Sequence, residues 1–286
     1  MSSKLIPDSP ADVAVIRHIT PNVVTVSMPF SRFGILRIGG RGTIMRLTSG
    51  ALAVFSPVAL TPETRAKVAE MGGNVGYLIA GDIEHHIYLS EWARAYPGAK
   101  LVGPKGLAEK RAAAHGKDAK IGAEPFSFVF GEAPGGDGDG RVVDDEFAAD
   151  FDVEYVAAHP NREIVLLYKP DRVLVEADLL FNLPAVEQYS RVPAAAAAPR
   201  EGALRRLANR IFEALNTTAG AARGTKRFLW YFIAGAGGDR DAFNASVRRI
   251  ASWDFDTIVP CHGETIEGRG KAVFEKMFEW HLQSRK

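Results

Sequence analysis

Cysteine is almost absent from this chain of 286 residues, which contains Cys261 and no other. A disulfide within the chain is therefore impossible, as we expect for a protein of a reducing compartment. The sequence also lacks an apolar run that approaches the length of a membrane-spanning helix, and its N-terminal residues lack the apolar stretch of a signal peptide. These absences predict a soluble, cytoplasmic protein that does not enter a membrane.

An excess of one charge is absent too. The chain has 35 Lys and Arg residues against 34 Asp and Glu residues, so its formal net charge is +1. A balanced charge gives no general attraction for nucleic acid or for an anionic membrane surface, and no basic run with interleaved aromatic residues occurs. We therefore expect neither nucleic acid nor a membrane as a partner, and we expect the ligand to be a small-molecule substrate.

The hydrophobic pattern indicates strands followed by helices, in two successive halves. Residues 22–30 and 42–58 are rich in Val, Ile, Thr and Phe and are bounded by turn residues, which is typical of strands. Thr61 as a cap and Pro62 in the first turn then predict a helix. Strands and helices alternate from there, and a second run of strands begins at residue 151. This order predicts the α/β class, as a four-layer αββα sandwich of two mixed β-sheets flanked by helices.

The two halves are expected to form one domain over residues 1–286, with a mainly helical insertion at about residues 190–250. Gly and Asp dominate residues 131–141, which predicts a loop. Residues 191–200 are an alanine-rich connector bounded by prolines. The apolar segment 226–235 could cover a pocket or form the contact of a homodimer, and helical spacing alone does not separate these two roles.

Four of the seven histidines follow directly after expected strands, and they are His85, His86, His159 and His262. Asp178 ends a further apolar β-run. Loops that leave a rigid sheet can bring such groups together, and imidazoles with a carboxylate are suitable ligands for zinc, iron or manganese. Each residue also has an ordinary alternative, a hydrogen-bonded loop histidine or a capping aspartate. Their common placement favours a metal site.

The other histidines have no such placement. His18, His115 and His281 lie in polar or helical surroundings, and we interpret them as surface residues. Cys261 beside His262 is expected to be a small buried side chain rather than a ligand. The acidic residues Asp82 and Glu84 could be ligands or bases, yet acidic residues before a helix are also expected from its dipole.

The strand-end residues resemble the metallo-β-lactamase fold superfamily and, within it, the branch known as the domain of unknown function DUF4336. The resemblance covers roughly residues 20–283. It rests on "LIAGDIEHHIYLSEWARAYPGAKLVGP", "AAHPNREIVLLYKPDRVLVEADLLFN" and "IVPCHGE". The main motif of the superfamily, His-x-His-x-Asp-His, corresponds in place to "GDIEHH".

This correspondence implies one metal ion rather than two. Gly81 and Ile83 occupy the positions of the two leading histidines, and neither can bind a metal through its side chain. The first of the two family sites would then keep His159 and Asp178 alone. A shift by one residue would place Asp82 and Glu84 at the leading positions instead, and this alternative stays open.

The second family site would keep four ligands, which are His85, His86, Asp178 and His262. Three imidazoles and one carboxylate suit zinc, which is the first expectation, and they also suit iron or manganese. The resemblance implies a metal-dependent hydrolase of a small ester, lactone, thioester or related substrate. In that reaction Asp178 would orient the attacking water, and His159 would hydrogen-bond a substrate oxyanion. The alternatives are an oxidoreductase or lyase with the same site, and a non-catalytic binding protein.

Overall fold

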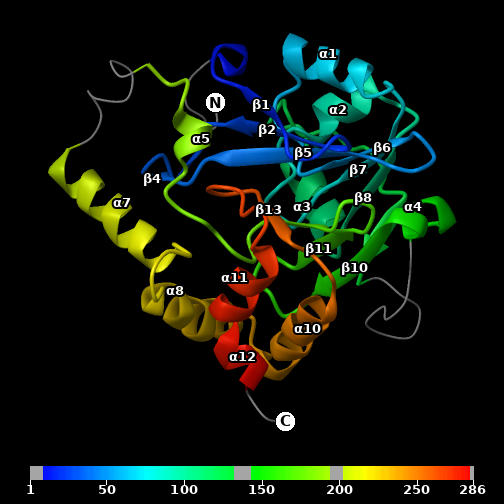
Figure 1. Ribbon diagram of the computed structural model, residues 1–286. Helices are drawn as coiled ribbons and strands as arrows, with labels where there is room; N and C mark the ends of the chain where they lie inside the picture. Colours follow the sequence, from blue (N-terminus) through cyan, green and yellow to red (C-terminus); the bar gives the residue numbers. More distant parts are fainter. Residues whose placement is uncertain (1–8, 132–142, 194–201, 284–286) are drawn as a thin grey trace.

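The computed structural model describes residues 9–131, 143–193 and 202–283. Within these ranges the chain forms two large sheets with helices on their outer faces (Figure 1). The loop predicted for residues 131–141 lies, after Gly131, outside the described residues. The same holds for residues 194–200 of the predicted connector.

The larger sheet has seven strands in the order β1-β2-β5-β6-β7-β8-β9. Its first four strands pair antiparallel and the rest pair parallel. The strands are β1 (Val15–His18), β2 (Val23–Met28), β5 (Gly40–Arg46), β6 (Leu52–Phe55), β7 (Val75–Ile79), β8 (Lys100–Pro104) and β9 (Phe128–Phe130). A small hairpin of β3 (Ser31–Arg32) and β4 (Leu36–Arg37) leaves this sheet between β2 and β5.

The smaller sheet has four strands in the order β10-β11-β12-β13. The strands are β10 (Phe151–Val156), β11 (Glu163–Tyr168), β12 (Val173–Glu176) and β13 (Thr257–Pro260). The first two pairings are antiparallel, whereas β12 and β13 pair in parallel, from Val173 opposite Thr257 to Glu176 opposite Pro260. Both sheets are therefore mixed, and the loops after β12 and β13 leave from the same edge.

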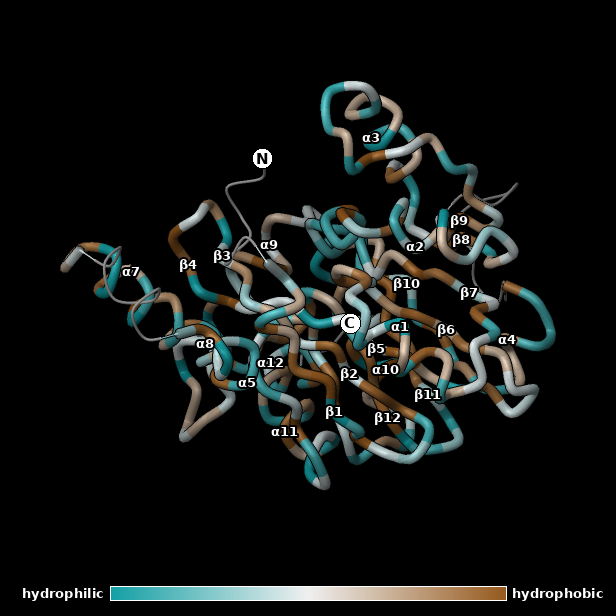
Figure 2. Tube along the Cα trace, turned by 90° about the horizontal axis from the view of Figure 1, so that it is seen from above, coloured by the Kyte–Doolittle hydropathy of each residue, from teal (hydrophilic) through white to brown (hydrophobic). Residues whose placement is uncertain are grey.

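Three apolar layers separate four structural layers, which confirms the predicted αββα sandwich. The outer face of the larger sheet packs on α1 (Pro62–Glu70), α2 (Leu89–Ala95) and α3 (Leu107–Ala114). The two sheets pack on each other. The outer face of the smaller sheet packs on α10 (Arg240–Ser252), α11 (Gly270–Met277) and α12 (Glu279–Gln283). Figure 2 shows the hydrophobic residues gathered along the strands between these layers.

Local sequence explains where the first helix begins and why the inner strands read as continuous apolar runs. The Oγ1 of Thr61 accepts a hydrogen bond from the backbone N–H of Thr64 at 3.2 Å, and Pro62 occupies the first turn of α1. All four residues of β6, Leu52 to Phe55, are apolar and buried. A strand covered on both faces needs no polar side chains for solvent, so its sequence does not alternate.

Between β12 and α10 the regular elements of the described residues are helices joined by loops. This part contains α5 (Val186–Tyr189), α7 (Ala203–Leu215), α8 (Arg223–Phe228), the π-helical η2 (Leu229–Ile233) and α9 (Ala234–Ala236). A further short helix, α4 (Asp145–Asp150), precedes β10, and the 3₁₀ turn η1 (Pro10–Asp12) precedes β1. In none of the described helices do length and hydropathy reach what a membrane span requires. The division of the chain into one domain with an insertion stays a prediction.

One surface prediction is wrong. His18 and His115 are exposed as expected, but the side chain of His281 is buried, with 1% of its surface exposed. Its ring lies against Phe243, and its Nδ1 is 2.7 Å from Oδ1 of Asn244. The reason is helical periodicity: His281 follows Phe274 and Phe278 by seven and three residues, so all three share the inner face of the closing helices.

Candidate metal centre

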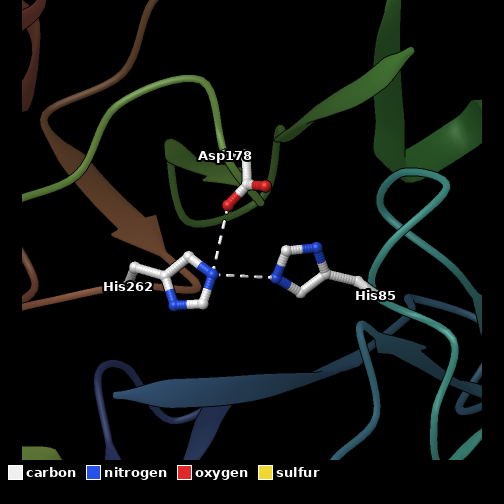
Figure 3. A group of neighbouring side chains, drawn as sticks. All are labelled: His85, Asp178 and His262. Carbon is white, nitrogen blue, oxygen red and sulfur yellow. Dashed lines mark hydrogen bonds and ion pairs between the residues drawn. The ribbon is translucent and has the colours of Figure 1, made fainter. Parts of the chain in front are cut away.

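Three side chains converge where three strands end. His85 follows β7 of the larger sheet, whereas Asp178 and His262 follow β12 and β13 of the smaller sheet (Figure 3). Nε2 of His85 lies 3.1 Å from Nε2 of His262, and that nitrogen lies 3.1 Å from Oδ1 of Asp178. Each residue offers one ligand atom, and these atoms all lie within 4.8 Å of one another. The centre therefore forms at the junction of the two sheets.

The hydrogen bonds of the two imidazoles fix which nitrogen carries the proton. Nδ1 of His262 lies 2.6 Å from the carbonyl oxygen of Gly39, which can only accept, so this nitrogen must be the donor. Nδ1 of His85 donates in the same way to Oδ1 of Asp82 at 2.8 Å. In the neutral rings both Nε2 atoms then carry lone pairs. Two lone pairs 3.1 Å apart repel each other, unless a proton or a cation lies between them.

The electrostatics of the centre favour a cation. Burial lowers the pKa of His85, but the Asp82 and Asp178 carboxylates outweigh it and raise this pKa to about 9. Burial raises the pKa of Asp178, yet His85 and His262 outweigh it and hold this pKa well below its usual range. Asp178 is thus ionised, and its Oδ1 accepts no hydrogen bond from a described residue.

These donors fit a divalent metal ion. Two imidazole nitrogens bound to one tetrahedral zinc ion, each at about 2.0–2.1 Å, lie about 3.3 Å apart, and the two Nε2 atoms here are 3.1 Å apart. Both rings donate their other N–H to an oxygen, the arrangement that orients histidine ligands in metal sites. Oδ1 of Asp178 supplies a free carboxylate oxygen at the same point.

The loop after β7 explains how His85 is aimed. Oδ1 of Asp82 accepts hydrogen bonds from the backbone N–H groups of Glu84 and His85, at 2.7 and 2.8 Å, as well as from the His85 ring. Asp82 therefore contacts the Nδ1 side of the His85 ring, whereas Nε2 of this ring faces His262. Glu84 forms an ion pair with Lys110 at 2.6 Å. Neither carboxylate belongs to the group of ligand atoms found among the described residues.

Gly81 and Ile83, at the positions of the two leading histidines of the motif, are closely packed against neighbouring residues. A Cβ added to Gly81 would lie 2.5 Å from the Phe55 ring and 2.7 Å from Oγ of Ser56. Ile83 packs against the core beneath the outer helices. The space that a first metal site would need at these positions is therefore taken by the protein itself.

His86 points elsewhere, although it is adjacent to His85. Its Nδ1 is 3.4 Å from Nη1 of Arg111, which also donates to the His86 carbonyl oxygen at 3.0 Å. Burial, together with the charges of Lys110 and Arg111, lowers the pKa of His86 to about 4. The ring is thus neutral beside a buried guanidinium and is outside the group formed by His85, Asp178 and His262. The role of His86 as a ligand stays a prediction.

His159 lies near the centre but is arranged as a donor. Its Nδ1 accepts a hydrogen bond from the backbone N–H of Asn161 at 3.2 Å, so the proton of the neutral ring is on Nε2. Burial lowers the pKa of His159, which keeps the ring neutral. Nε2 is buried and has no partner among the described residues. An N–H group in that position is suited to an oxygen atom of a ligand rather than to a metal ion.

Sequence reasoning missed two polar residues that hold Asp178. Nδ2 of Asn161 donates to Oδ2 of Asp178 at 2.5 Å, and Oε2 of Glu163 accepts from the backbone N–H of Asp178 at 3.0 Å. Burial and the neighbouring carboxylates of Asp82 and Glu176 raise the pKa of Glu163 well above its usual range. A glutamate that begins the apolar run "EIVLLY" was the available signal, because acidic residues are rarely buried without a partner.

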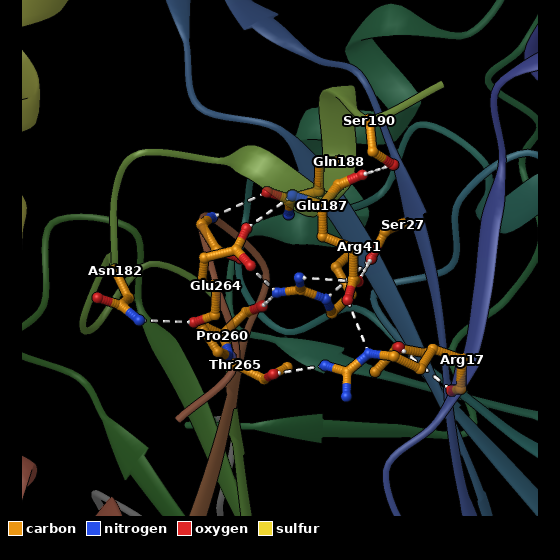
Figure 4. A network of polar contacts seen from close by, with 12 residues as sticks. Arg17, Ser27, Arg41, Asn182, Glu187, Gln188, Ser190, Pro260, Glu264 and Thr265 are labelled. Carbon is orange, nitrogen blue, oxygen red and sulfur yellow. Dashed lines mark hydrogen bonds and ion pairs between the residues drawn. The ribbon is translucent and has the colours of Figure 1, made fainter. Parts of the chain in front are cut away.

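Sequence reasoning also missed Arg41, which is buried and holds the loop that carries His262 (Figure 4). Its Nη1 donates to the carbonyl oxygens of Pro260 and Gly263, both at 2.7 Å, and its Nη2 lies 3.3 Å from Oε1 of Glu187. Nε2 of Gln188 donates to the carbonyl oxygen of Cys261 at 3.0 Å. The backbone on both sides of His262 is thus fixed by side chains from β5 and α5.

Two cavities flank the centre. The larger, of about 240 Å³, is lined by Asp178 and His159 on one side and by apolar residues of α7, α8 and η2 on the other. The smaller, of about 80 Å³, is lined by His85, His262 and Tyr88. Arg32 lines both. The three residues of the centre therefore border a cavity on each of two sides.

Comparison with known proteins gives a family match for one segment of the sequence and structural matches for the fold. Residues 33–106 match the family described as "Domain of unknown function (DUF4336)". No curated protein matches the sequence.

Solved structures match over nearly the whole chain. A metallo-β-lactamase from Pontibacter korlensis is 10% identical, covers 95% of this chain and all of its own, and has a TM-score of 0.53. A metallo-β-lactamase from Hirschia baltica is 11% identical over 94% of this chain and 97% of its own, with a TM-score of 0.53. The metal-soaked Flv1 flavodiiron core from Synechocystis sp. PCC6803 is 12% identical over 94% of this chain and 60% of its own, with a TM-score of 0.54. The protein therefore has the metallo-β-lactamase fold.

Proposed function

We propose that the protein is a metal-dependent hydrolase with one divalent ion, zinc as the first expectation, held by His85, Asp178 and His262. The observation that carries this proposal is the pair of Nε2 atoms 3.1 Å apart. Each ring is oriented by a hydrogen bond from its other nitrogen, and the free oxygen of Asp178 lies beside them. Donor atoms oriented in this way can all bind one cation that lies between them.

The reaction class follows from the groups around the centre. A divalent ion at this point would act as a Lewis acid and would lower the pKa of a water molecule. Asp178 is ionised and held by Asn161, so its carboxylate can orient a water molecule. His159 presents a buried N–H to the same cavity, where it can donate to a negatively charged oxygen of the substrate. Ester, lactone and thioester bonds develop such an oxygen when water attacks the carbonyl carbon.

A second candidate function has a specific observation in its favour. Two imidazoles and one carboxylate, with open positions, are also the donor set of non-haem Fe(II) enzymes. The similar solved structures include a flavodiiron core. With iron in the centre, the protein would be an oxidoreductase, and the identity of the metal separates the two functions.

The test is metal content by elemental analysis of protein purified without added metal. We expect about one equivalent of zinc, iron or manganese in the parent protein. His262→Ala should lose the metal, because it removes one of three ligands, whereas His115→Ala, at an exposed histidine, should keep it. His86→Ala should also keep it, because that ring faces Arg111.

The result also decides between the functions. Zinc, together with hydrolysis of a panel of small esters, lactones and thioesters that fails in His262→Ala, supports the hydrolase. Iron with oxygen uptake supports the oxidoreductase. A protein without metal contradicts both, and loss of the metal in His86→Ala would show that the set of ligands is different.

A further inference from the structure

We propose that the substrate has an apolar, preferably aromatic, arm and a negatively charged group, and that the larger cavity and Arg32 recognise these two parts. This inference rests on the proposed function, because it names the class of substrate for that same centre. The evidence for it is the apolar wall of the larger cavity and the guanidinium of Arg32, which has no carboxylate partner among the described residues.

The larger cavity is apolar on the side away from the centre. Rings of Phe181, Phe212 and Phe228 line it in a row, with centroids 6.4 Å apart from each ring to the next. Leu229 and Ile233 of η2 complete this wall. Aromatic side chains in such a row offer faces and edges to a further ring. An apolar arm of the substrate can therefore be buried against them, away from water.

Asn216 and Thr225 line the helical side of the same cavity, and its other polar groups lie at the centre. They include Asp178, which belongs to the metal site, and His159, whose Nε2–H has no partner among the described residues. A substrate whose apolar arm occupies the far wall therefore places its polar end at these groups. Hydrolysis of an ester there breaks the bond between the acyl carbon and the leaving oxygen. Water supplies the hydroxyl group to that carbon and a proton to the leaving oxygen.

Arg32 gives this cavity a positive charge. It is half-buried on β3 and lines both cavities, so its side chain stands beside the centre. In the described part of the chain no carboxylate forms an ion pair with its guanidinium, whose Cζ lies 5.4 Å from the centroid of the Phe33 ring. By contrast, the guanidinium of Arg41, which lines only the smaller cavity, donates to two carbonyl oxygens, to Ser27 and to Glu187. A guanidinium without a partner beside an apolar cavity fits a carboxylate or a similar anion.

The test is isothermal titration calorimetry of the full-length protein with three probes. The probes are 4-phenylbutyrate, its neutral amide and acetate, and each titration is done on protein as purified and again after treatment with a chelator. Arg32→Gln removes the charge at the cavity. Arg94→Gln makes the same change at an exposed position of α2 that lines neither cavity.

We expect the acid to bind about tenfold more tightly than the amide, the effect of one charge-assisted contact. Arg32→Gln should remove this preference and Arg94→Gln should keep it. Acetate should bind at least about 100-fold more weakly than 4-phenylbutyrate, because it lacks the arm that the phenylalanine rings cover.

Equal affinities of the parent protein for the acid and the amide overturn the inference. An equal loss of the preference for the acid in Arg32→Gln and Arg94→Gln overturns it too. A failure of the proposed function looks different. If elemental analysis finds no metal while the chelated protein still prefers the acid through Arg32, the hydrolase is wrong and the class of ligand stands.

Discussion

Gly81 occupies a position where the surrounding side chains leave no room for a larger residue. The Cβ position of Gly81 is filled by Phe55 and Ser56, so we expect Gly81→Ala to lower the free energy of unfolding by about 1–3 kcal/mol, as overpacking of a core does. Gly98→Ala is the control, because a Cβ there meets no atom within 4 Å. Urea unfolding of the two variants measures the difference. An Ala at position 81 as harmless as the one at position 98 would mean that the space is open.

The raised pKa of His85 predicts how the chelated protein responds to pH. An imidazolium that is stabilised in the folded state contributes stability in full below its unfolded pKa of about 6.5, and the contribution is lost as the pH rises to about 9. We expect the free energy of unfolding to fall by on the order of 2 kcal/mol over this window. His85→Gln should flatten the curve, and an unchanged slope in that variant would assign the effect to other groups.

Metal affinity should have the opposite dependence on pH. A metal ion needs the lone pair of His85, so it competes with the proton that this pKa describes. Zinc affinity measured with a competing chelator should therefore rise as the pH increases toward 9. An affinity independent of pH between 6.5 and 9 would exclude His85 as a ligand.

For single residues, the sequence indicated which side chains lie at strand ends, but not which of them lie together. The histidines and Asp178 at strand ends could be found from the pattern alone. Which of His85 and His86 faces the centre could not, because neighbouring side chains on a loop point in different directions. The choice depends on Arg111, a buried residue 25 positions later in the chain.

Among the elements, Arg41 connects β5 with the loop after β13 and with α5. Arg41→Met should lower the free energy of unfolding by about 3–5 kcal/mol, because it leaves Glu187 and buried carbonyl oxygens with fewer partners. It should also weaken metal binding, since the backbone on both sides of His262 loses its support. Arg46→Met, on the same strand, is the control, because Arg46 donates to Asn22 near the end of the strand.

Thermal unfolding and metal titration of both variants measure these two effects. A loss of stability in Arg41→Met without any change in metal affinity would limit Arg41 to a structural role. An equal loss in Arg46→Met would show that the effect belongs to the charge on β5 and not to the contacts of Arg41.

Elements with strong local signals were predictable, whereas those set by distant partners were not. The helix cap at Thr61 and the apolar strands are determined by a few residues that are neighbours in the sequence. The hairpin of β3 and β4 has only two residues in each strand, and neither strand pairs with another strand in the described part of the chain. The π-helical turn η2 lies within an apolar run, and no local pattern separates such a turn from an α-helix.

For the molecule as a whole, a bound ion should raise stability by mass action. At a free zinc concentration 100 times the dissociation constant we expect a gain of about 2.7 kcal/mol in the free energy of unfolding. His262→Ala should lose this gain while His115→Ala keeps it. Thermal unfolding with added zinc and with a chelator measures the effect, and an equal shift in both variants would point to binding elsewhere on the chain.

The layered architecture followed from the order of strands and helices together with the resemblance of a few segments. The pairing of β12 with β13 did not, because about 80 residues separate the paired strands, from Val173 opposite Thr257 onward. This pairing also places Asp178 beside His262, so the pattern that fixes the fold is the one that assembles the centre.

The position of the centre between the two sheets has a kinetic consequence. His85 and His262 are 177 residues apart in the chain and come from different sheets, so one ion bound to both acts as a removable cross-link across the interior. Release of the ion and separation of the sheets would then share a barrier. An ion held in this way would leave slowly even where its equilibrium affinity is modest, and the rate at which a chelator strips the protein would report how often the sandwich opens.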